Sequence, residues 1–113
     1  MPFLSLDAIE AEEVVPGVRV RNVYLKSTML SFIEYEPGAE VPEHRHLHEQ
    51  IGVVLEGELE ATVDGQTRKV GEGGVIAVPS NVLHSSKALT KVRFVCCSSP
   101  VMRPYKFGPD DLR

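Results

Sequence analysis

The stretch that decides the fold is GAEVPEHRHLHEQIGVVLEG, residues 38–57, where three of the chain's four histidines stand within five residues. In an extended strand His44 and His46 point to the same face, about 6.6 Å apart along the chain. Neutral imidazole is the commonest protein ligand for metals, and two rings at that separation can reach one ion. Straight extension would place Gln50 about 13 Å beyond His46. Either the chain therefore folds back between them, or the outer residues, including His48, have another role, such as a solvated position at the rim.

Around this stretch, turn residues recur every eight to twelve positions, which predicts many short strands in a small all-β barrel. Asp64-Gly65 accepts positive φ at both positions and predicts a type I′ hairpin. Helix is expected only as a short turn within Leu6–Glu13, capped by Ser5. The expected strands are Val18–Tyr24, Met29–Tyr35, Gln50–Leu55, Glu58–Val63, Gln66–Val70, Gly74–Val78 and Val92–Cys97.

Length and composition predict one domain, residues 1–113 of 12.5 kDa, with a core over approximately 14–100. The net charge of −4 without Lys/Arg clusters argues against a nucleic-acid partner. No stretch approaches the ~18 apolar residues of a membrane span, and the first residues lack a signal-peptide pattern. A cytoplasmic protein is expected, with the adjacent Cys96 and Cys97 as two buried thiols rather than a disulfide.

Two motifs carry a family resemblance. The first reads Gly38-x5-His44-x-His46-x3-Gln50-x6-Gly57, and the second reads Gly73-x5-Pro79-x-Asn81-x2-His84. Together they resemble the two motifs of the cupin superfamily, which implies a jelly-roll β-barrel with one divalent metal ion (Zn, Mn, Ni or Fe) inside. The resemblance assigns the metal ligands to His44, His46, Gln50 and His84, the last arriving from a later strand.

The chain departs from the cupin pattern at three positions, where Gln50 replaces Glu, Asn81 replaces Gly and Ala88 replaces Asn. Asn tolerates the left-handed backbone better than most residues. The carboxamide of Gln50 neutralises none of the charge of a divalent ion, so the site should favour anionic or oxygen-rich ligands. It also donates less electron density than a carboxylate, which makes oxygen activation a weaker expectation.

The Gln within HRHLHEQIG resembles the cupins that linearise unsaturated uronate sugars. Those enzymes carry Asp-x-Phe-Ser-Pro-x-Arg after the last core strand, whereas this chain has Cys96 and Ser98 at the Asp and Phe positions and Arg103 displaced by one residue. The resemblance implies a Lewis-acid isomerase or lyase acting on a small oxygenated compound such as a sugar acid. A cupin dioxygenase and a non-catalytic binding module are the alternatives, and the missing Asp favours the binding module.

Two further residues are weaker candidates for the catalytic site. Glu49 could orient a ligand imidazole, and Arg103 could bind a substrate carboxylate, although either could equally be a surface residue.

Assembly is indicated by the strand Gln50–Leu55, whose apolar residues fall on both faces and imply that both are covered. The cover is either the opposite sheet or a second copy. With the prolines of the C-terminal tail, this predicts a homodimer with a small-molecule ligand in each chain.

Overall fold

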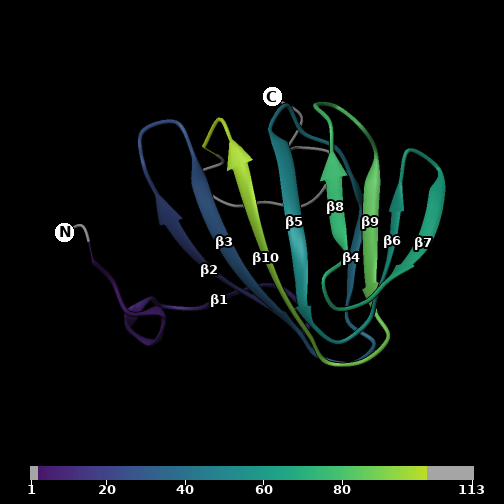
Figure 1. The fold of residues 1–113 in the computed structure, drawn as a ribbon, viewed down its shortest axis with the longest axis horizontal. Helices are drawn as coiled ribbons and strands as arrows, with labels where there is room; N and C mark the ends of the chain where they lie inside the picture. The colour runs from purple at the N-terminus through teal and green to yellow at the C-terminus, as the bar shows by residue number, and fades with distance from the viewer. Residues whose placement is uncertain (1–2, 102–113) are drawn as a thin grey trace.

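The computed structural model describes residues 3–101, which form two facing antiparallel sheets (Figure 1). The six-stranded sheet has the order β1-β2-β3-β10-β5-β8, and the four-stranded sheet has the order β4-β9-β6-β7. The strands are β1 (Glu12–Val15), β2 (Val18–Tyr24), β3 (Met29–Tyr35), β4 (Glu40–His44), β5 (Glu49–Glu56), β6 (Leu59–Val63), β7 (Gln66–Val70), β8 (Val75–Val78), β9 (His84–Ala88) and β10 (Val92–Ser99). The expected jelly-roll architecture is confirmed.

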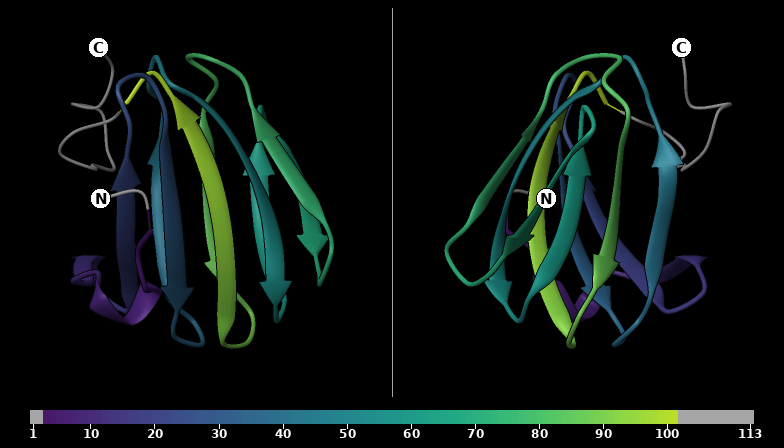
Figure 2. Two further views of the ribbon diagram at one scale, coloured as in Figure 1. Left: turned by 60° about the vertical axis from the view of Figure 1, so that its left-hand side comes forward. Right: turned by 90° about the vertical axis from the view of Figure 1, so that its right-hand side faces the viewer.

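The core lies between the two sheets, which Figure 2 shows from two further sides. Side chains alternate between buried and outward positions along β3 and β10, as the period of two of a strand requires. The buried apolar cluster comprises Val18, Val20, Met29, Ile33, Tyr35, Val41, Val54, Leu59, Ala88, Val92, Phe94 and Cys96.

The predicted strands over Val18–Tyr24, Met29–Tyr35 and Gln66–Val70 have the predicted bounds, and the other four differ by no more than two residues at either end. Three strands are absent from the ranges predicted by the residue pattern, although the resemblance placed His84 on a later strand. These are β1, β4 and β9, whose sequences EEVV, EVPEH and HSSKA are polar or interrupted by proline. β4 tolerates Pro42 because it is an edge strand, where a missing N–H costs no ladder bond.

The short helical turn expected within Leu6–Glu13 is present, over the first residues of that range. A 3-10 turn covers Leu6–Ala8 alone, and Ser5 makes no side-chain capping hydrogen bond. Glu12 and Glu13 instead pair with β2. No helix in residues 3–101 has the length and apolar character to cross a membrane.

Two local predictions about the backbone are confirmed. Asp64 and Gly65 have φ of 50° and 77° between the paired strands β6 and β7, so they close the predicted hairpin. Asn81 has φ of 66°, the left-handed conformation expected at that motif position.

The expectation of two buried thiols is wrong for one of them. Cys96 is buried in the core, whereas Cys97 is exposed on the outer face. Adjacent residues of a strand point to opposite faces, so both could be buried only if both faces were covered within the chain.

Candidate metal centre

His44 and His84 meet because the strands that carry them pair in one sheet. They are directly opposed in the β4–β9 ladder, and their ring centroids are 4.1 Å apart. The register shifts between Val41 and His44, the type of irregularity that re-aims a side chain. Two residues forty positions apart in sequence are thereby placed side by side in the barrel.

His46 joins this pair from the segment just after β4. Its backbone carbonyl accepts a hydrogen bond of 2.8 Å from the N–H of Asn81, which ties this segment to the loop before β9. The His46 ring lies 5.4 Å from that of His44 and 4.9 Å from that of His84, centroid to centroid. All three histidines are buried, and one ring nitrogen from each lies within 4.8 Å of the others.

Main-chain carbonyls orient the three rings. Nδ1 of His44 donates a hydrogen bond of 2.8 Å to the carbonyl of Pro42. Nδ1 of His46 donates to the carbonyl of His48 (3.0 Å), and Nδ1 of His84 donates to the carbonyl of Val82 (2.9 Å). Since a carbonyl can only accept, each Nδ1 carries the proton and each Nε2 presents a lone pair. Nε2 of His46 and of His84 is buried and makes no hydrogen bond within residues 3–101.

Burial keeps these histidines neutral. Desolvation is the larger cause and the charge of His84 the second, and together they lower the pKa of His44 to about 4. The same two causes lower the pKa of His46 to about 4. Desolvation also lowers the pKa of His84. Metal ligation requires unprotonated imidazole, so the tautomers, the burial and the convergence of the three rings all fit a divalent ion.

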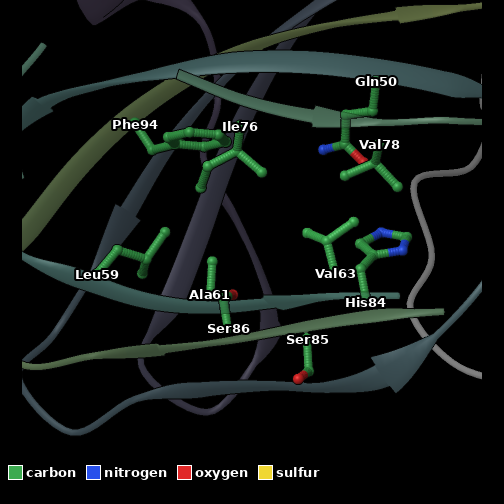
Figure 3. Close-up of a pocket in the computed structure, with 10 residues that line it drawn as sticks. All are labelled: Gln50, Leu59, Ala61, Val63, Ile76, Val78, His84, Ser85, Ser86 and Phe94. Carbon is green, nitrogen blue, oxygen red and sulfur yellow. The ribbon is translucent and has the colours of Figure 1, made fainter. Parts of the chain in front are cut away.

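Gln50 lies in the opposite sheet, near the start of β5. The chain bends at Leu47 and His48, between β4 and β5, which lie in different sheets. It therefore folds back between His46 and Gln50, which is one of the two alternatives that the sequence left open. The amide nitrogen of Gln50 donates to Sγ of Cys96 at 3.2 Å. Figure 3 shows the amide oxygen on the side of His84 and the nitrogen turned away from it.

The remaining candidates lie outside the three-histidine cluster. His48 is half-buried rather than solvated at the rim, and its ring centroid is 5.4 Å from that of His46. Glu49 is exposed. Main-chain carbonyls, and not Glu49, accept the hydrogen bonds that orient the three imidazoles. Arg103 lies outside the described residues. Ser98, opposite Gln50 in the β5–β10 ladder, has a buried Oγ without a hydrogen bond in the described part of the chain.

A small pocket, partly open to solvent, adjoins the cluster inside the barrel (Figure 3). Sequence reasoning did not identify it, because its walls come from strands of both sheets. It is lined by Gln50, Leu59, Ala61, Val63, Ile76, Val78, His84, Ser85, Ser86 and Phe94.

Comparison with solved structures shows the same fold in other proteins. An RmlC-like cupin from Shewanella frigidimarina has a TM-score of 0.87 and 27% identity, over 91% of this chain and 94% of that one. KdgF from Halomonas sp. has a TM-score of 0.85 and 24% identity, over 91% and 96% of the two chains. Salicylate 1,2-dioxygenase from Pseudoaminobacter salicylatoxidans has a TM-score of 0.73 and 22% identity, over 76% of this chain and 28% of that one. The likeness to the last two concerns the fold alone.

Sequence comparison identifies a curated relative and the family. Oryzines biosynthesis cluster protein J of Aspergillus oryzae is 33% identical over 66 residues, which are 58% of this chain but only 37% of that protein's length. The family pattern of the cupin domain matches residues 31–98, a range that contains the three clustered histidines and Gln50. The chain belongs to the cupin domain family.

Proposed function

We propose that the protein is a metal-dependent enzyme of the isomerase or lyase type that acts on a small oxygenated substrate. Small oxygenated compounds include the sugar acids suggested by the sequence. The observation that carries the proposal is the convergence of three neutral, buried imidazoles beside a pocket, with His84 belonging to both. One divalent ion per chain would be held by His44, His46 and His84, with Gln50 as a fourth, neutral oxygen donor.

The proposed ligand set has a distinct electrostatic character. None of its four side chains carries a negative charge, so the full charge of a divalent ion would act on the substrate. When bound, such an ion supplies Lewis acidity that polarises a carbonyl or hydroxyl group. Enolisation and elimination benefit from this stabilisation of developing negative charge on oxygen.

A pair of hydroxyl groups, of which only that of Ser86 belongs to a pocket-lining residue, supplies the chain's own candidate for handling a proton. The Oγ of Ser86 and the phenol oxygen of Tyr35 are 2.8 Å apart. Burial raises the pKa of Tyr35 to about 12, so the phenol stays protonated at neutral pH. The pair can therefore donate a hydrogen bond or pass a proton at Ser86 Oγ, but it does not supply a general base.

The non-catalytic binding module is the second candidate function, and the composition of the pocket favours it. No carboxylate is present among the pocket-lining residues of the described chain. Cys96 and Ser98 also occupy the positions where the uronate-linearising cupins have Asp and Phe. A protein built this way would bind its ligand through the metal without turning it over.

The two functions are separated by metal analysis followed by turnover. We expect elemental analysis of the purified protein to give one transition-metal ion per chain, and the loaded protein to isomerise or cleave members of a panel of keto acids and uronates. The matched variant His84→Ala should lose both metal and turnover. Stoichiometric metal with tight ligand binding but no turnover would favour the binding module, and oxygen uptake by the iron form would favour a dioxygenase. Absence of any bound transition metal would refute the metal-based proposal.

A further inference from the structure

The walls of the pocket are more apolar than a sugar acid requires. The side chains of strands β6, β8 and β10 that face it are all hydrocarbon. These are Leu59, Ala61, Val63, Ile76, Val78 and Phe94. Phe94 and Leu59 lie at the end of the pocket away from His84 (Figure 3). A Cβ at Gly52 would collide with the Phe94 ring, so this glycine provides the space in which the ring closes that end.

The polar side chains that line the pocket are few, namely Gln50, His84, Ser85 and Ser86. The Gln50 amide nitrogen is bonded to Cys96, and the Ser86 hydroxyl is paired with Tyr35. None of the lining residues within the described chain is charged. A sugar ring carries more hydroxyl groups than these few side chains can pair with, so several would leave water without gaining matching partners, which is unfavourable.

We infer that the ligand has an apolar body, an aryl or branched alkyl group, and a single carboxylate or enol end. The polar end binds at the three-histidine cluster, and the apolar body lies toward Phe94 and Leu59. This inference rests on the proposed function, since the metal anchors the polar end. The enclosed space is small, so the apolar body is limited to one ring or a short branched chain.

The experiment is a calorimetric series on the metal-loaded protein with acetate, isovalerate, phenylacetate and glucuronate, repeated on the metal-free protein. We expect affinity to rise by about three- to fourfold for each added methylene that enters the pocket. Phenylacetate should bind tightest, glucuronate no better than acetate, and each affinity should require the metal.

A matched pair of variants locates the apolar body. Ile76 faces the pocket, whereas its neighbour Val75 is 64% exposed on the other face of β8. Ile76→Thr should weaken phenylacetate binding by about three- to tenfold and leave acetate unchanged. Val75→Thr should change neither affinity. If Ile76→Thr fails to fold, the isosteric Val63→Thr on the opposite wall replaces it.

The outcomes distinguish this inference from the function on which it rests. Metal-dependent binding in which glucuronate equals or exceeds phenylacetate overturns the apolar ligand class and leaves the metal-based function standing. Phenylacetate binding that is unchanged without metal overturns the histidine anchor, and with it the inference and the proposed function. Failure of every carboxylate to bind the loaded protein, or equal effects of Ile76→Thr and Val75→Thr, also overturns the inference.

Discussion

The amide nitrogen of Gln50 donates a hydrogen bond of 3.2 Å to Sγ of Cys96, which joins the fourth candidate ligand to the neighbouring strand β10. The bond occupies the nitrogen and leaves the amide oxygen as the group on the side of His84. The cupin motif that the sequence resembles has Glu at the position of Gln50. Both members of this amide–thiol pair are uncharged groups, so neither brings a carboxylate to the candidate ligand set.

Removing the thiol should loosen Gln50. In Cys96→Ala the amide loses its acceptor and can rotate, so we expect metal affinity to fall by about 10- to 100-fold, as for other groups that orient ligands. Cys96→Ser keeps an acceptor at this position and should retain most of the affinity. The measurement is competition with a chromophoric chelator. Equal affinities in both variants would show that Cys96 does not act through Gln50.

Removing a histidine should cost the metal and spare the fold. His46→Ala and His84→Ala should each lose the ion in elemental analysis while their circular dichroism stays that of a β-protein, because the apolar cluster packs without it. His48→Ala is the matched control, since His48 lies outside the converging group, and it should retain the ion. Full occupancy in both of the first two variants would refute the ligand assignment.

Gln50→Glu tests the role of charge. A carboxylate would lower the net charge of the loaded site, so metal retention should rise or stay level while affinity for citrate falls. Any Lewis-acid turnover should fall as well, because less positive charge faces the developing oxyanion. Citrate affinity is compared in both proteins at one pH and ionic strength. Equal or tighter binding by the variant would mean that Gln50 does not act through charge.

The metal-free protein should lose stability as the pH falls from 6.5 toward 4. Burial lowers the pKa of His44 and His46 to about 4, so between these values the unfolded chain binds more protons than the folded one. Each such shift corresponds to on the order of 3 kcal/mol of lost stability at the acid end of the window. Urea unfolding at several pH values measures the slope, which should be smaller in His44→Asn. A flat profile would contradict the buried, neutral state of these rings.

The homodimer expected from β5 stays a prediction, and the structure indicates a face for it. Gly52 and Val54 are buried on the inner face of the strand, whereas Ile51 and Leu55 on the other side are 59% and 50% exposed. Val75 of the neighbouring strand β8 is 64% exposed beside them. A contiguous apolar face of this kind suits self-association about a twofold axis.

Light scattering at micromolar concentration should therefore give the mass of a dimer. Ile51→Lys, which places a charge within this face, should shift the mass toward the monomer. Leu25→Lys is the control, because Leu25 is equally apolar and 76% exposed but lies in the turn after β2. A monomeric mass for the unmodified protein would refute the dimer.

The sequence by itself determined the features that depend on short-range patterns. The alternation of apolar residues located seven strands, because side chains of a strand repeat every two residues. Asp64-Gly65 and Asn81 identified positive φ, because few residues tolerate that conformation. The spacing of His44 and His46 indicated a metal site, since clustered imidazoles are a direct chemical signal. Strands β1, β4 and β9 were missed because their residues are polar or include proline, so they lack the apolar alternation by which the other strands were located.

Only the tertiary structure decided how these residues are combined into a site. His44 meets His84 through strand pairing across forty residues, and Gln50 meets Cys96 across forty-six. The carbonyls that orient the imidazoles belong to the backbone, which carries no residue-specific signal in the sequence. The apolar character of the pocket likewise exists only when strands of both sheets face one another. Local patterns set backbone conformation and the faces of strands, whereas long-range register, which depends on packing of the whole core, sets the distances on which binding and chemistry depend.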